Sequence, residues 1–136
     1  MIRPVVRDVF FLGQKSEPAA QGDLSVGVDL RDTLTANRDR CVGMAANMIG
    51  VKKRVIIVST GLMDLVMYNP VILRRDAPYE AEEGCLSLDG TRKTTRWQRI
   101  EVEYRDDAWR RHRQSYSGWI AQIIQHEMDH LEGIVI

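Results

Sequence analysis

The chain is poor in the features that mark several classes of protein. Its 2 cysteines in 136 residues are too few for a small fold held together by disulfide bonds. Its 19 basic and 19 acidic residues cancel, so no overall field attracts nucleic acid or an anionic membrane. Apolar runs such as 55–58 and 65–68 are far below the roughly 20 residues of a membrane span. The beginning of the chain also lacks the apolar core of a signal peptide. These absences predict a cytoplasmic protein that binds neither DNA nor a membrane.

The chain also lacks internal repeats, low-complexity tracts and proline-rich linkers. Its 4 prolines and 10 glycines are scattered as they would be in turns. With 44% hydrophobic residues, it is long enough to bury roughly two thirds of its unfolded surface. We therefore expect one domain that spans residues 1–136.

Two helices are predicted near the ends of the chain. Asp23 is a candidate cap for a helix over 23–38, whose apolar residues Val26, Leu30 and Leu34 recur every four positions. Ser117 is a candidate cap for the second helix, which carries apolar residues from Trp119 to Leu131 and ends near Gly133.

The region between the two helices is predicted to form strands. The β-branched run in 54–60 indicates a buried strand, and 67–73 another that Asn69-Pro70 bends or places at an edge. Apolar and charged residues alternate over 100–105, and a turn at Asp106-Asp107 leads into a strand over 109–116. The sequence therefore predicts an α+β fold, with mixed or antiparallel strands around a central C-terminal helix.

The last helix carries a His-Glu-x-x-His motif, the pattern of metal hydrolases. His126 and His130 are four residues apart, so both imidazoles lie on one helical face and can bind one divalent ion. Glu127 could reach a water on that ion without ligating it. The alternative is that two histidines merely share a face.

Cys85, in the segment Glu83-Gly84-Cys85-Leu86-Ser87, is the candidate third ligand. A thiolate and two imidazoles leave the fourth position of a tetrahedral ion open, as a catalytic site requires. Taken alone, a single cysteine is more often a small core residue than a ligand. Its combination with the histidine motif favours the metal site.

These residues resemble the motifs of the peptide deformylase family. That family carries a Gly-x-Gly-x-Ala-Ala-x-Gln stretch, a Glu-Gly-Cys-x-Ser segment and a Gln-His-Glu-x-Asp-His segment. Here the second and third motifs match at every fixed position, at 83–87 and 125–130, and the first is represented by 41–48. The resemblance implies removal of the formyl group from the N-terminal methionine of nascent peptides. It also implies Fe²⁺ as the efficient metal, with Zn²⁺ or Ni²⁺ able to occupy the same site.

The resemblance assigns roles to individual residues. Cys85, His126 and His130 would hold the metal, with Glu127 as general acid and base. Arg92 and the backbone of Gly43 would line the peptide site. The mechanism that these residues suggest adds one group: the backbone N–H of Leu86, next to the cysteine, would meet the charge that develops on the formyl oxygen.

An apolar pocket for methionine could draw on Val42 and Ile123, which are otherwise ordinary core residues. Small residues at Gly43, Ala45 and Ala46 could let a substrate backbone approach closely, or could simply be packed in the core. Both interpretations remain open from the sequence.

The first motif departs from the family pattern in two places. Cys41 replaces its first glycine, and Met48 replaces the glutamine whose amide donates to the oxyanion. A thioether has no proton to donate. Losing one such donor typically costs about 10²–10³ in turnover. A water or the neighbouring Asn47 could replace the amide; otherwise the chain is a weakened enzyme.

Two further functions compete with an active deformylase. One is a metal-containing binding or regulatory paralogue whose catalysis decayed with the glutamine. The other is an ordinary zinc peptidase, although no histidine follows His130 to serve as its third ligand. The basic run 110–113 could touch ribosomal RNA transiently, but without interleaved aromatic residues a solvated hairpin is the simpler interpretation.

Overall fold

The computed structural model of the chain describes residues 1–85 and 87–134, without the side chain of Leu88. Within these residues, a five-stranded antiparallel sheet has the order β1-β2-β3-β4-β5. The strands are β1 (Gly43–Ala45), β2 (Val55–Ser59), β3 (Asp64–Cys85), β4 (Leu88–Arg105) and β5 (Arg111–Ser117). The helices are α1 (Val9–Leu12), α2 (Leu24–Ala36) and α3 (Gly118–Leu131), with short 3-10 helices η1 (Gln21–Asp23) and η2 (Ala46–Ile49). The predicted α+β class is confirmed, and the paired strands of the sheet are antiparallel rather than mixed.

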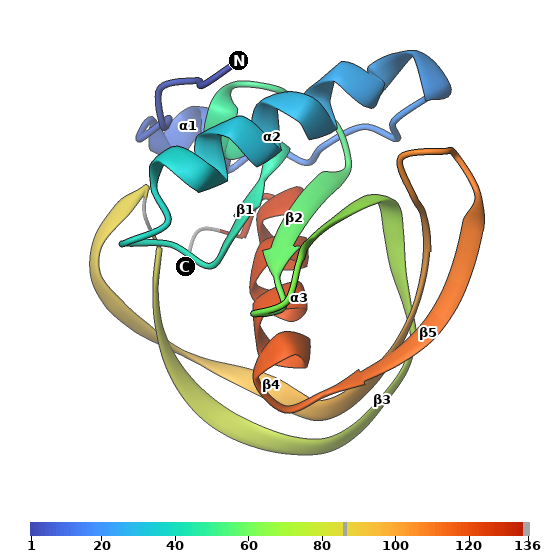
Figure 1. The fold of residues 1–136 in the computed structure, drawn as a ribbon. Helices are drawn as coiled ribbons and strands as arrows, with labels where there is room; N and C mark the ends of the chain where they lie inside the picture. Colours follow the sequence, from blue (N-terminus) through green and yellow to red (C-terminus); the bar gives the residue numbers. More distant parts are fainter. Residues whose placement is uncertain (86, 135–136) are drawn as a thin grey trace.

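Helix α3 occupies the centre of the molecule, where the long curved strands β3, β4 and β5 bend around it (Figure 1). It also packs against β1 and β2, while α2 packs against β2. Successive side chains of a strand point to opposite faces, so a strand covered on both faces can be apolar throughout. This explains why Val55, Ile56, Ile57 and Val58 are all fully buried.

The Asn69-Pro70 pair bends β3 and does not mark an edge of the sheet. The pairing of β3 with β4 shifts register between Tyr68 and Val71, and Asn69 has a φ of 53°. The Asn69 side chain fixes this bend, because its Oδ1 accepts from the backbone N–H of Ala19 at 2.7 Å and its Nδ2 donates to the Ala19 carbonyl at 2.9 Å.

The ends of the helices differ in detail from the expected caps. Helix α2 follows η1, and the Asp23 carboxylate accepts from the backbone N–H of Ala20 at 2.7 Å instead of capping α2. Ser117 precedes α3, but its hydroxyl makes no capping hydrogen bond. Gly133 follows α3 with a φ of 76°, the left-handed conformation in which helices commonly end.

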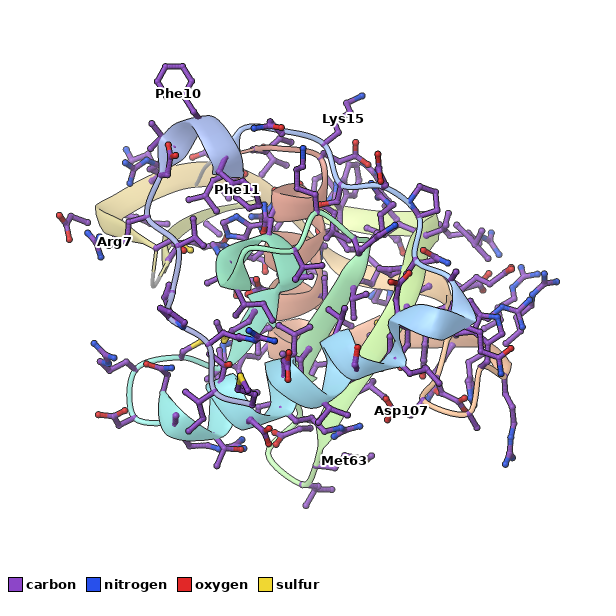
Figure 2. The ribbon with its side chains drawn as sticks, turned by 90° about the horizontal axis from the view of Figure 1, so that it is seen from above. Arg7, Phe10, Phe11, Lys15, Met63 and Asp107 are labelled. Carbon is purple, nitrogen blue, oxygen red and sulfur yellow. The ribbon has the colours of Figure 1, made fainter. Side chains whose placement is uncertain are left out.

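Several large apolar side chains lie on the surface, Phe10 and Trp119 among them. Phe10 of α1 is 84% exposed and projects away from the molecule (Figure 2), whereas Leu12 in the same helix is fully buried. Trp119, which the sequence placed with the apolar residues of the last helix, is 58% exposed. Among the described residues, no helix is both long and apolar enough to cross a membrane.

Candidate active site

Three potential metal ligands converge between the end of β3 and helix α3. The Cys85 Sγ lies 3.3 Å from His130 Nε2, which is 3.2 Å from His126 Nε2. The three donor atoms all lie within 4.8 Å of one another. Two donors bound at about 2.0–2.3 Å to one tetrahedral ion would be roughly 3.3–3.7 Å apart, so this donor set fits a divalent metal.

A chain of buried charges orients His126. Its Nδ1 lies 2.8 Å from Glu83 Oε1, which leaves Nε2 directed toward the other two donors. Arg96 binds the same carboxylate through Nε and through Nη2 at 2.6 Å, and reaches Asp129 with Nη1 at 2.6 Å. Burial opposes ionisation of Glu83, but the hydrogen bonds from His126, Arg96 and Gln122 dominate and lower its pKa to about 2.

The motif glutamine Gln125 fixes α3 against the sheet. Its Oε1 accepts from the backbone N–H of Trp97 at 2.8 Å, and its Nε2 donates to the Trp97 carbonyl at 2.8 Å. One side chain thus satisfies both backbone polar groups of a residue in β4. These two hydrogen bonds thereby fix the position of the next residue, His126, relative to β4.

A cavity of about 200 Å³ opens beside the candidate metal ligands. It brings together most of the residues that the sequence and the resemblance singled out: Val42, Gly43, Cys85, Ile123, His126 and Glu127. Position 43 has room only for glycine, because α3 lies so close to it. A Cβ there would lie 2.7 Å from the Ile123 side chain and 3.0 Å from Glu127 Oε2. The first motif therefore abuts the face of α3 that carries the catalytic candidates.

Glu127 is a buried carboxylate suited to proton transfer. Burial raises its pKa to about 7, and its Oε1 has no hydrogen-bond partner among the described residues. A group whose pKa lies near neutrality can both accept and return a proton under ordinary conditions. This is the chemistry that a hydrolytic acid and base requires.

Met48 lines the cavity but offers it no donor. Its side chain is buried, and its Sδ accepts from the backbone N–H of Ala45 at 3.4 Å. Asn47 does not replace the missing amide, because its Nδ2 points elsewhere and donates to the His130 carbonyl at 2.9 Å. The alternative in which Asn47 serves as the substitute donor therefore finds no support in the structure, because adjacent residues of η2 face different neighbours.

His130 does not line the cavity, although its Nε2 lies 3.3 Å from Cys85 Sγ. Two further candidate residues lie apart from the cavity or outside the described part. Arg92 is exposed on β4, where its Nη1 donates to the Asp89 carbonyl at 3.2 Å, and it does not line the cavity. Its contact with a peptide stays a prediction. Leu86, whose backbone N–H is predicted to stabilise the oxyanion, lies outside the described residues.

Sequence reasoning missed the polar residues that support the site. Arg96 is only 3% exposed, yet it sits in a polar stretch of β4 that gives no local sign of burial. Gln122 lines the cavity and donates to Glu83 Oε2 at 2.9 Å. Its position, one helical turn before His126, was the available signal.

Comparison with known proteins identifies the family. The family model for polypeptide deformylase matches residues 11–136. A peptide deformylase of Clostridium beijerinckii is 57% identical over 136 residues, which is 100% of both chains. The chain belongs to the peptide deformylase family. A second deformylase, from Picosynechococcus, is 35% identical and matches 91% of this chain and 71% of its own length.

Solved deformylase structures share the fold. A Met-Ala-Ser bound class I type b peptide deformylase from Acinetobacter baumannii superposes with a TM-score of 0.90 at 28% identity, covering 99% of this chain and 97% of that one. The peptide deformylase from Thermus thermophilus gives a TM-score of 0.87 at 31% identity and covers 99% and 83%.

Family membership settles the general activity. The chain is a metal-dependent hydrolase that removes the N-formyl group from the N-terminal methionine of peptides and releases formate. The two competing functions, an inactive metal-containing paralogue and an ordinary zinc peptidase, find no support in these comparisons. Met48 is thus a feature of a deformylase.

Proposed function

We propose that Cys85, His126 and His130 hold the catalytic metal, and that Glu127 moves the protons of deformylation. The observation that carries this assignment is the convergence of the three donor atoms within 4.8 Å beside a cavity that Glu127 also lines. We further propose that residues 1–136 form one catalytic domain.

Bound to these ligands, a divalent ion would supply a Lewis acid that polarises the formyl carbonyl and activates a water molecule. Glu127 would take the proton of the attacking water and return it to the departing amine. Val42 and Ile123 would contact the methionine side chain, and Gly43 would let the substrate approach α3. Glu83, which binds the Nδ1 of His126, would keep the Nε2 of that ring directed at the ion.

We propose Fe²⁺ as the native metal, with Zn²⁺ or Ni²⁺ able to occupy the same ligands. The support is the resemblance of the three motifs to iron-using deformylases, together with a mixed thiolate and imidazole set that accepts each of these ions. Substrates would be the formylmethionyl ends of nascent chains in the cytoplasm, with at most transient contact with the ribosome. Arg111 and Arg113 of the basic run already bind Glu103 and Glu101, which disfavours that run as a site for RNA.

The test is anaerobic purification with Fe²⁺, followed by measurement of formate release from formyl-Met-Ala-Ser and of bound metal. Glu127→Gln should keep its metal and lose about 10²–10⁴ in kcat, because it can no longer accept a proton. Cys85→Ala should lose the metal itself. Parallel loading with Zn²⁺ and Ni²⁺ should give lower kcat/KM than Fe²⁺.

A matched control is Glu132→Gln, which changes the same residue type just beyond α3, where Glu132 binds Arg54. This variant should keep both metal and turnover. Full activity in Glu127→Gln, or stoichiometric metal in Cys85→Ala, would contradict the assignment of these residues.

A further inference from the structure

Arg40 places a positive charge at the cavity that holds the candidate catalytic residues. It lines the cavity together with Cys85, His126 and Glu127, yet its own side chain is exposed to solvent. Among the described residues that line this cavity, Arg40 alone is a lysine or arginine. Its guanidinium therefore lies where the cavity meets solvent.

The Arg40 side chain is held in place by a buried asparagine. Its Nη2 donates to Asn37 Oδ1 at 2.7 Å, and Asn37, only 8% exposed, donates through Nδ2 to the Thr33 carbonyl at 2.8 Å. The Arg40 backbone N–H also donates to the Asn37 carbonyl at 2.9 Å. The guanidinium is thus tethered to the end of α2, which reduces the entropy lost when it binds a partner.

The positive charge of Arg40 is not neutralised within the described part of the chain. No carboxylate lies within ion-pair distance of it there, whereas Arg38, two residues earlier, binds Asp64 at 2.6 Å. The Glu83 carboxylate in the same cavity already receives hydrogen bonds from Arg96 and Gln122. Four of the five N–H donors of the Arg40 guanidinium have no partner among the described residues and are available for a ligand.

The substrate must pass this charge. Its formyl group has to reach Cys85, His126 and Glu127, while the rest of the peptide continues out of a cavity of only about 200 Å³. An extended chain advances about 3.3 Å per residue, so the first residues after methionine lie at the opening. Arg40 is positioned there to contact their side chains.

We propose that Arg40 is a specificity-determining residue that selects formylmethionyl peptides with an acidic side chain at the second or third position. The inference rests on the proposed function, because it requires the cavity beside Cys85, His126 and Glu127 to be the peptide site. The fixed guanidinium attracts the carboxylate of an acidic peptide and repels the ammonium group of a basic one. Both effects raise the ratio of kcat/KM for the acidic peptide to kcat/KM for the basic peptide.

The experiment compares kcat/KM for peptides that differ in one charge. Formyl-Met-Glu-Ser and formyl-Met-Lys-Ser, and the pair formyl-Met-Ala-Glu and formyl-Met-Ala-Lys, are used as C-terminal amides so that no terminal carboxylate competes for Arg40. In at least one pair the glutamate peptide should be favoured about fivefold at low salt. The ratio should fall toward one in 0.5 M NaCl, because salt screens exposed charges.

Variants assign the preference to Arg40. Arg40→Gln should bring the ratio to about one, and Arg40→Glu should reverse it. Arg38→Gln is the matched control: it removes a neighbouring arginine that binds Asp64 and does not line the cavity, so the ratio should persist. Equal kcat/KM for both members of both pairs, or a ratio that survives in Arg40→Gln, would overturn the proposal.

The neutral peptide formyl-Met-Ala-Ser amide separates this inference from the proposed function. Turnover of that peptide, lost in Glu127→Gln, with no charge preference in the other pairs would leave the catalytic assignment intact and reject the role of Arg40. Turnover of all peptides that is unaffected by Glu127→Gln would reject both.

Discussion

The two sides of the cavity are built by different means. On the side of β3 and α3, the candidate ligand His126 is held by a buried chain of hydrogen bonds and ion pairs through Glu83, Arg96 and Asp129. On the opposite side, residues 40–48 present a cationic rim, a thiol, a glycine and the thioether of Met48. The first side carries the residues of the second and third motifs, and the second side carries those of the first motif, from which the sequence is expected to depart at Cys41 and Met48.

The difference shows which requirements are strict. Metal ligands need fixed atom types and geometry, and the groups that orient them are constrained almost as strongly. On the opposite side, which the proposed function places in contact with the peptide, packing and charge could change while the reaction is retained. If this is correct, substitutions on the side of β3 and α3 should be costly, and substitutions in residues 40–48 should be tolerated.

The largest effect is expected from breaking the buried charges behind His126. Arg96→Met leaves Glu83 and Asp129 without their cation, so the free energy of unfolding should fall by about 3–5 kcal/mol in urea titrations at fixed metal content. Arg113→Met, which breaks an exposed pair with Glu101, should cost about 0–1 kcal/mol. Similar losses in both variants would show that the network does not stiffen this side.

The next effect concerns the thiol that replaces the first glycine of the first motif. Burial, followed by the nearby charge of Glu127, raises the pKa of Cys41 from 9.0 to about 12. Since the thiolate is the nucleophile, alkylation at pH 8 should be roughly 10³-fold slower than for an unperturbed cysteine and should rise about tenfold per pH unit below pH 12.

Mass spectrometry of the metal-loaded enzyme after iodoacetamide treatment measures this rate. Cys41 should react readily once the chain is unfolded in guanidinium chloride, which provides the reference. Rapid labelling of Cys41 in the folded enzyme would mean that this side of the cavity opens to solvent.

A smaller effect is expected from restoring the missing donor. In Met48→Gln, the new Oε1 can accept from the Ala45 N–H, as the thioether does, and leave the Nε2 donors facing the cavity. The value of one oxyanion donor predicts a rise in kcat of about 10²-fold with formyl-Met-Ala-Ser.

Met48→Leu is the matched control, because it conserves apolar volume without adding a donor. It should leave kcat close to that of the unsubstituted enzyme. An unchanged kcat in Met48→Gln, at equal metal content, would show that the absent amide does not limit this deformylase.

The sequence predicted the elements whose pattern is local. The four-residue recurrence of Val26, Leu30 and Leu34 located α2, and the alternation over 100–105 located the end of β4. The long polar stretch over 74–99 was missed, because β3 and β4 pair there through backbone hydrogen bonds that require no apolar pattern. The predicted caps at Asp23 and Ser117 are also wrong. The Asp23 carboxylate accepts from the backbone N–H of Ala20 instead, and the Ser117 hydroxyl makes no capping hydrogen bond.

By itself the sequence determined the candidate metal ligands. Helical geometry fixes the relation of His126 to His130, so their spacing alone places both imidazoles on one face. Only the tertiary structure decided which residues surround them: that Arg96 is buried behind Glu83, that Asn47 turns to the His130 carbonyl, and that Arg40 lines the cavity. These contacts join segments far apart in the chain, and their register depends on the packing of the whole sheet around α3 and on no local repeat.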